Sequence, residues 1–174
     1  MKKILVGLGL VSSLLFADNF TLSSSDLKGQ LTLKQEFNGF GCVGENVSPQ
    51  LSWQNAPKET KSFAITVYDP DAPTGSGWWH WVVFDIPKDK NTLAAGFGNS
   101  DSKEAIQSVT DYGKSGFGGA CPPKGDKAHR YIFTVHALDV DTLKLDESAN
   151  PALAGYYINA HSIAKASLIS YYGR

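Results

Sequence analysis

Two runs rich in β-branched and aromatic residues, 63–68 and 81–86, stand on either side of a short loop. The loop contains two prolines and two glycines, so backbone chemistry rather than packing sets its bends. Two such runs with a turn-rich connection predict a pair of antiparallel strands. In that pairing, Asp69 leaves the first strand at about the level where His80 enters the second. Polar groups are then gathered at one end of a sheet, where loops on a rigid scaffold usually form binding sites.

A second informative stretch, 113–125, holds five glycines and two prolines in thirteen residues. Such a loop can turn successive backbone N–H groups toward one point and form a concavity for an anion. It is not a P-loop, because it lacks the Gly-Lys-Ser/Thr ending and no helical pattern follows. The run 129–135 comes next and predicts a strand. Period two places His129 and Tyr131 on one face of it and Arg130 on the other.

Alternation also assigns faces on the strand that begins near His80. It predicts that His80, Val82 and Phe84 share one face, and that Trp79 and Trp81 take the other. Two strands then each bring a histidine to the same end of the sheet. Either histidine alone is equally well explained as a hydrogen-bonded core residue, so the inference of a site rests on several such groups coming together.

Most of the chain has the pattern of a β protein. Short alternating segments at 20–22 and 30–34 are typical of half-buried strands, and 51–53 resumes an extended pattern. No internal repeat or low-complexity linker divides the sequence. We therefore expect residues 18–174 to form one domain with a substantial core.

Helical signals are confined to the last part of the chain. The segment 151–154 begins with proline and predicts a short helix start. Asn159 is a good cap for a further helix over 160–168, where small and apolar residues form one stripe. The sequence thus predicts a mainly β chain with a helical end.

The first residues have the three-part form of a secretory signal: two lysines, an apolar run over 4–16, and Ala17 as the cleavage position. The run is shorter than the roughly twenty residues that a membrane span needs. Removing 1–17 takes two of the 16 basic side chains and leaves 14 against 17 acidic ones. A net charge near −3 gives no general attraction to nucleic acid or anionic lipid. We expect a periplasmic or secreted protein with no transmembrane segment after signal removal; an uncleaved anchor is the alternative.

The chain has two cysteines, Cys42 and Cys121, each in a glycine-rich loop. In an oxidising compartment, an even count favours a disulfide between them. The sequence does not decide whether their Cα atoms come within the ~4.4–6.8 Å that a disulfide requires. Two free, half-buried thiols are the alternative.

Several motifs occur in a fixed order along the chain: Asp69-Pro70-Asp71-Ala72-Pro73, Trp79-His80, Cys121-Pro122-Pro123-Lys124-Gly125 and His129-Arg130-Tyr131. They resemble the phosphatidylethanolamine-binding protein family, and more closely its bacterial branch, often labelled Raf kinase inhibitor-like. The segments 40–42, 46–49, 51–53 and 160–166 resemble that branch too, so the similarity covers nearly all of 18–174. It implies a large antiparallel sheet packed on a smaller one, with short peripheral and C-terminal helices.

The resemblance also implies a small anion pocket for phosphate or a phosphorylated head group. Its implied residues are Asp69, His80, His129 and Tyr131 as the lining, the backbone region of Gly119 and Pro123 closing one side, and Asp71 nearby. Where animal members carry a glycine before the two prolines, this chain has Cys121. The segment linked to partner regulation in animals does not match well, so the kinase role is not carried over.

Elementary chemistry is consistent with an anionic ligand. A protonated imidazole is a charge-assisted donor to phosphate, and the Tyr131 hydroxyl can donate one more hydrogen bond. Asp69 and Asp71 repel a dianion, so they are expected to orient the histidines or to meet an ammonium on the ligand; as an alternative, they only cap turns. The tryptophans at 78, 79 and 81 are core residues or rim the pocket.

These observations predict a non-catalytic binding protein for a small anionic or phosphorylated ligand, without a cofactor or bound metal. Metal binding is disfavoured because no tightly spaced ligand set occurs. A hydrolase that uses the His/Asp cluster is one alternative, although 75–77 is too short for the Gly-x-Ser-x-Gly turn of a serine nucleophile. A protein inhibitor of the protease or kinase type is another, and its protein partner is not specified by any linear stretch.

Overall fold

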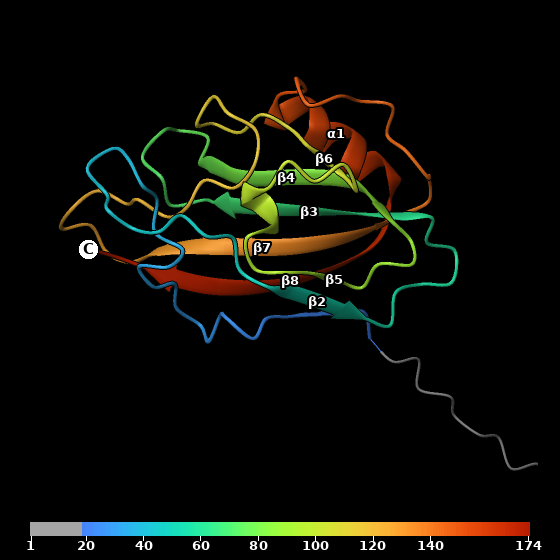
Figure 1. The fold of residues 1–174 in the computed structure, drawn as a ribbon, viewed down its shortest axis with the longest axis horizontal. Helices are drawn as coiled ribbons and strands as arrows, with labels where there is room; N and C mark the ends of the chain where they lie inside the picture. Colours follow the sequence, from blue (N-terminus) through green and yellow to red (C-terminus); the bar gives the residue numbers. More distant parts are fainter. Residues whose placement is uncertain (1–18) are drawn as a thin grey trace, which may run out of the picture.

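The computed structural model describes residues 19–174, which form two antiparallel β-sheets and one α-helix (Figure 1). The expected signal at 1–17 lies outside these residues. The small sheet has the order β1-β2-β5, with β1 at Thr21–Ser23, β2 at Leu51–Gln54 and β5 at Thr92–Leu93. The large sheet has the order β6-β4-β3-β7-β8, with β6 at Ile106–Gln107, β4 at Trp78–Pro87, β3 at Ser62–Asp69, β7 at His129–Leu138 and β8 at Ser162–Tyr172. The predicted mainly β fold, with a large sheet packed on a smaller one, is confirmed.

The central hairpin has the strands that the sequence predicts. β3 and β4 pair antiparallel, with Ser62 opposite Pro87 and Asp69 opposite Trp78. β7 pairs with the other edge of β3 and carries His129 at its first position. The end of β3 and the starts of β4 and β7 therefore lie at one end of the large sheet, on the left in Figure 1.

Apolar side chains pack on both faces of the large sheet. One cluster lies between the two sheets and includes Trp53 of β2 and Phe133 of β7. The other lies between the large sheet and α1 (Pro151–His161), and it includes Phe84 of β4 and Ile158 of the helix. The molecule thus has three layers: small sheet, large sheet and helix (Figure 1). Within 19–174, no helix is long and apolar enough to cross a membrane.

The predicted helix over 160–168 is wrong. The predicted helix start at 151–154 is confirmed: α1 begins at Pro151, and Asn150 rather than Asn159 is the cap, accepting a hydrogen bond from the backbone N–H of Leu153 at 2.9 Å. The chain becomes extended at 162 and forms β8, which pairs with β7 along its length. Side chains in β8 alternate between exposed and half-buried, a period of two. The alanine-rich stripe is compatible with both periods, and tertiary pairing overrides its helical propensity.

The predicted strand at 30–34 is also wrong. Gln30 makes one isolated bridge with Tyr171, and the backbone N–H of Leu31 donates to the carbonyl of Tyr171 at 2.9 Å. The chain then turns, because the N–H groups of residues 35 and 36 both donate to the carbonyl of Thr32. The alternation of Leu31 and Leu33 reflects one buried and one exposed side chain on a turn rather than a strand.

Candidate functional site

A small cavity of about 160 Å³ opens where β3 ends and β4 and β7 begin. Its volume is below the roughly 300–1,000 Å³ of sites for drug-sized ligands, so it suits a small chemical group. Five of the seven predicted site residues line it: Asp69, His80, Pro123, His129 and Tyr131. Residues that the sequence analysis did not assign to the site complete the lining, among them Phe40, Thr74, Tyr112 and Cys121. Of the tryptophans named as rim candidates, Trp78 alone lines the cavity.

A β-bulge sets the direction of the His80 side chain. The ladder between β3 and β4 pairs Val67 with Trp81 and Tyr68 with Trp79, so His80 is an extra residue on β4. Beyond the bulge, the alternation of side chains is inverted. Trp79 packs on Tyr68, with ring centroids 4.6 Å apart, at the helix-side cluster, whereas Trp81 lies in the core between the sheets.

The predicted grouping of His80 with Val82 and Phe84 is therefore wrong. Those two apolar side chains pack toward α1, whereas the His80 ring lies 5.1 Å from the ring of Tyr131, a residue of the core between the sheets. Simple alternation misses this because a bulge adds one residue and re-aims a side chain, as is common beside functional sites.

His80 is held as a neutral ring. Its Nδ1 donates to the carbonyl of Gly118 at 2.8 Å and lies 3.2 Å from the carbonyl of Gly119. Its Nε2 is buried and has no hydrogen-bond partner within 19–174. Burial lowers the pKa of His80 below the ordinary value, although the two carbonyls and the charge of Asp69 act the other way. The expected imidazolium donor is therefore replaced by an imidazole with a free lone pair.

Gly119 supports the site from behind rather than lining it. Its N–H donates to Asn46 Oδ1 at 2.7 Å, and its carbonyl accepts from the Tyr112 hydroxyl at 2.7 Å as well as facing His80. A Cβ at this position would lie 2.2 Å from the carbonyl oxygen of Gln35, so only glycine fits so close an approach. The backbone N–H of Gly119 is therefore not offered to a ligand.

Asp69 and His129 form a buried pair. His129 Nδ1 donates to Asp69 Oδ2 at 2.8 Å, and both side chains are almost inaccessible to solvent. The other oxygen of Asp69 accepts from the N–H of Asp71 at 2.8 Å. His129 Nε2 lies 3.6 Å from Asp126 Oδ2. The carboxylate of Asp69 thus fixes the orientation of the imidazole, as the sequence analysis expected of an aspartate in this place.

Asp71, predicted to lie nearby, points away from the cavity. Its carboxylate accepts from Nε and Nη2 of Arg130, both at 2.8 Å, and from the Arg130 backbone N–H at 2.9 Å. These hydrogen bonds from Arg130 hold the pKa of Asp71 well below its ordinary value. As alternation predicts, Arg130 is exposed and opposite in direction to His129.

Tyr131 and Trp78 each have a hydrogen-bond donor with no partner among the described residues. The Tyr131 hydroxyl and the Trp78 indole Nε1 are buried, and neither is hydrogen-bonded among the residues that the structure describes. Burial raises the pKa of Tyr131, so its phenol keeps its proton. With His80 Nε2, three polar atoms of cavity-lining residues are unsatisfied.

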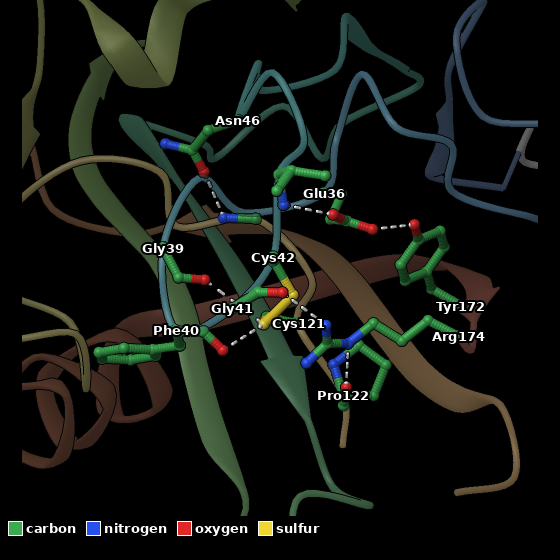
Figure 2. The surroundings of a disulfide bond; sticks show 12 residues. Glu36, Gly39, Phe40, Gly41, Cys42, Asn46, Cys121, Pro122, Tyr172 and Arg174 are labelled. Atoms are coloured by element: carbon green, nitrogen blue, oxygen red, sulfur yellow. Dashed lines mark hydrogen bonds between the residues drawn. A yellow bond between two sulfur atoms is a disulfide. The ribbon is translucent and has the colours of Figure 1, made fainter. Parts of the chain in front are cut away.

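A disulfide and an arginine join the loops beside the cavity. Cys42 and Cys121 are bonded, with Cα atoms 5.9 Å apart. Figure 2 shows Arg174 beside this bond; its Nε donates to the carbonyl of Pro122 at 2.6 Å and its Nη1 to that of Gly41 at 2.9 Å. The two loops that carry Phe40 and Cys121 into the lining are thus joined by a covalent bond and by hydrogen bonds.

Glu36 anchors the same region from inside. Its carboxylate accepts from the Val43 N–H at 2.8 Å and from the Tyr172 hydroxyl (Figure 2). Burial alone would raise the pKa of Glu36, but these hydrogen bonds, together with the charge of Arg174 and the N–H of Gly44, outweigh it and lower the pKa. Burial and the bond to this carboxylate raise the pKa of Tyr172 to about 12. Glu36 therefore links the loop that carries Cys42 to Tyr172 at the end of β8.

A family model described as phosphatidylethanolamine-binding protein matches residues 23–173. The chain belongs to this family. The resemblance that its motifs carry is thereby confirmed.

Bacterial proteins of similar length are among its relatives. The UPF0098 protein YbhB of Escherichia coli is 50% identical over 152 residues, which cover 84% of this chain and 96% of YbhB. The crystal structure of E. coli YbcL, described as a new member of the mammalian PEBP family, superposes with a TM-score of 0.87 at 48% identity and covers 89% of this chain and 98% of YbcL. A putative family homolog from Chlamydia trachomatis has a TM-score of 0.75 at 30% identity, with coverage of 89% and 97%.

Proposed function

We propose that this protein binds a small anion, phosphate or a phosphorylated head group, in the cavity at the end of the large sheet, and does so without catalysis. The observation that carries the proposal is the set of three buried, unpartnered polar atoms on His80, Tyr131 and Trp78. Leaving such an atom unpaired costs about 1–3 kcal/mol, and a ligand that pairs with it recovers that energy. The cavity accepts only a small group, which fits a phosphate.

The family description supports the same ligand class, because phosphatidylethanolamine carries a phosphorylated head group. The disulfide and the signal-like pattern of 1–17 support a location outside the cytoplasm, where such a bond persists. We include that location, periplasmic or secreted, in the proposal. A role in modulating other proteins is not needed to explain the cavity.

Catalysis is disfavoured by the hydroxyls near the Asp69–His129 pair. Among the described residues that line the cavity, Thr74 has the one aliphatic hydroxyl, and it donates to the carbonyl of Gly77 at 2.5 Å. A covalent mechanism needs a nucleophile within reach of its base, and this hydroxyl is engaged elsewhere. The pair therefore orients an imidazole, and we assign it to binding.

Calorimetric titration with inorganic phosphate tests the proposal. Tyr131→Phe removes a hydrogen bond to a charged ligand worth about 1.5–3 kcal/mol, so the affinity should fall roughly ten- to a hundredfold. Tyr156→Phe is the matched control, because Tyr156 is exposed on α1, which packs on the opposite face of the large sheet. Equal affinities for the two variants would remove the site from the cavity, and hydrolysis of a phosphomonoester by the wild type would favour the enzyme alternative.

A further inference from the structure

The hydrogen on the His80 ring has a fixed place. Nδ1 faces two backbone carbonyls, and carbonyl oxygens only accept, so Nδ1 carries the hydrogen. Nε2 of the neutral ring then has a lone pair. His80 is 3% exposed, and Nε2 meets no partner in the described part of the chain. The cavity thus contains a buried acceptor that a donor on the ligand can satisfy.

The other two unpartnered atoms have the opposite polarity. The indole Nε1 of Trp78 only donates, and the hydroxyl of Tyr131, a residue that is 1% exposed, donates as well. A ligand that satisfies all three atoms must therefore accept hydrogen bonds at some of its oxygens and donate one from a hydroxyl. A fully deprotonated oxyanion places a lone pair against the lone pair of His80.

The charges around the cavity also favour a ligand that keeps a proton. Among the described residues, no lysine or arginine lines it, whereas Asp69 does. The titratable groups that face His80 or lie close to the cavity are Asp69, Asp111, Tyr112, Asp126, His129 and Tyr131. Arg130 pairs with Asp71 outside the cavity, and Arg174 donates to the backbone carbonyls of Pro122 and Gly41. Such surroundings disfavour a dianion and favour the form of a ligand that carries less charge.

We propose that the pocket selects a phosphate group that keeps at least one P–O–H, namely inorganic phosphate or the monoanion of a phosphomonoester, and rejects phosphodiesters and sulfate. The hydroxyl donates to His80 Nε2, while the remaining oxygens accept from Tyr131 and Trp78. This inference rests on the proposed function and narrows its ligand. It departs from the family description in one respect: phosphatidylethanolamine is a phosphodiester, so the inference keeps the phosphorylated head group as a free monoester and excludes the intact lipid.

The proposal has a consequence for protons. A phosphomonoester loses its second proton with a pKa of about 6, so at pH 7.5 the free ligand is almost entirely a dianion. Binding of the monoanion at that pH takes up close to one proton from solution for each ligand bound. The apparent affinity should fall roughly tenfold for each pH unit above the second pKa of the ligand.

Titration calorimetry with four small probes tests this on the whole protein: methyl phosphate, dimethyl phosphate, inorganic phosphate and sulfate. Buffers of different ionisation enthalpy at pH 5 and pH 7.5 count the protons taken up. We expect methyl phosphate and inorganic phosphate to bind, with proton uptake near zero at pH 5 and near one at pH 7.5 for methyl phosphate. Dimethyl phosphate and sulfate should bind at least about a hundredfold more weakly at pH 7, because a buried polar group left unpaired is a strong basis for rejection.

A variant locates the selecting atom. His80→Gln replaces the lone pair with an amide that can turn its NH₂ toward the ligand, so the preference for phosphate over sulfate should shrink roughly tenfold or more. If this variant does not fold, the wild-type comparison of the four probes still decides. Equal affinity for sulfate and phosphate, or binding of methyl phosphate without proton uptake at pH 7.5, would overturn the inference and leave the proposed anion site standing. Failure of all four probes to bind would overturn both.

Discussion

Two buried histidines, on the two strands that flank β3 in the large sheet, differ in how many of their ring nitrogens have partners. His136 on β7 has both occupied: Nε2 lies 3.1 Å from Thr66 Oγ1, and Nδ1 lies 3.1 Å from Ser162 Oγ. Ser162 in turn donates to the carbonyl of Ile158 at 2.6 Å. His80 on β4 has one nitrogen occupied and the other free beside a cavity.

Burial lowers the pKa of both rings, to about 3 for His136, so a shifted pKa does not separate them. What separates them is whether the second ring nitrogen has a hydrogen-bond partner: it does in His136, and it does not in His80 among the described residues. A fully satisfied buried network makes a core rigid, whereas a half-satisfied one needs another explanation, and here the explanation is a ligand. Accounting for each donor and acceptor therefore distinguishes a structural histidine from one in a site.

The largest expected effect is that of reducing the disulfide, which joins loops at the cavity around His80 and is absent from the packed strands around His136. Reduction of the disulfide, which joins residues separated by 79 positions, should lower the free energy of unfolding by about 4–5 kcal/mol on a chain-entropy basis. It should also weaken binding of phosphate, because Cys121 and Phe40 line the cavity. Urea denaturation and calorimetry with and without a reductant measure both quantities. Unchanged affinity after reduction would mean that hydrogen bonds such as those of Arg174 suffice to hold the loops.

The second prediction concerns pH and His136. Because its folded pKa is lowered to about 3, the folded state binds fewer protons than the unfolded state in acid. Its stabilising contribution is complete above the unfolded pKa of about 6.5 and is lost as the pH falls toward 3, at up to roughly 1.4 kcal/mol for each pH unit. Denaturation curves at pH 7, 5.5 and 4 give the slope. His136→Gln should flatten it, and an unchanged slope would assign the acid sensitivity to other groups.

A third prediction compares how substitutions of similar size, one in the cavity and one beside His136, change the free energy of unfolding. Tyr131→Phe deletes a buried hydroxyl without a partner, so the unliganded protein should gain up to about 1 kcal/mol in its free energy of unfolding. Thr66→Val deletes the partner of His136 Nε2 and should lose about 1–2 kcal/mol. Denaturation without ligand compares them. If both variants lose stability equally, the Tyr131 hydroxyl is satisfied in the free protein.

The smallest effect is expected for Arg130→Ala. The arginine side chain is 46% exposed and pairs with Asp71 outside the cavity, and an exposed ion pair contributes about 0.2–1 kcal/mol. Affinity for phosphate should stay within about twofold of the wild type if the side chain takes no part in binding. Calorimetry and urea denaturation check both values. A loss of binding comparable to that of Tyr131→Phe would show that the ion pair is part of the site.

Much of this arrangement can be predicted from the sequence where strands are regular. On β7, period two correctly separates His129 and Tyr131 from Arg130, because no bulge interrupts the pairing of these residues with β8. The level of Asp69 beside the start of β4 follows from the hairpin. The motifs of the family add Pro123, a lining residue that no periodicity could identify.

The errors have specific physical causes. Alternation mispredicts the face of His80 because a bulge leaves no mark in the pattern of apolar residues. The pattern over 160–168 predicts a helix because alanine and serine fit both periods, and the pairing of β8 with β7 is a long-range contact. Tyr112 carried no local signal at all, since its role depends on the path of the loop that brings it to Gly119. The glycines at 118 and 119 were visible as a loop, but their use as acceptors for His80 was not.

The bulge at His80 has a counterpart further along β4. Phe63 pairs with Ile86 and Ile65 with Val83, so a second extra residue lies near Asp85, whose φ is 56°. Each extra residue shifts the alternation of side chains between the two faces of the sheet by one position. The first shift exchanges the faces, and the second restores the original assignment. A strand shortened by both would present the same apolar side chains to both cores. The additional length of β4 therefore adds nothing to the hydrophobic interior. One extra residue places the His80 ring beside Tyr131, and Asp85, near the other, accepts hydrogen bonds from Thr142 and Leu143.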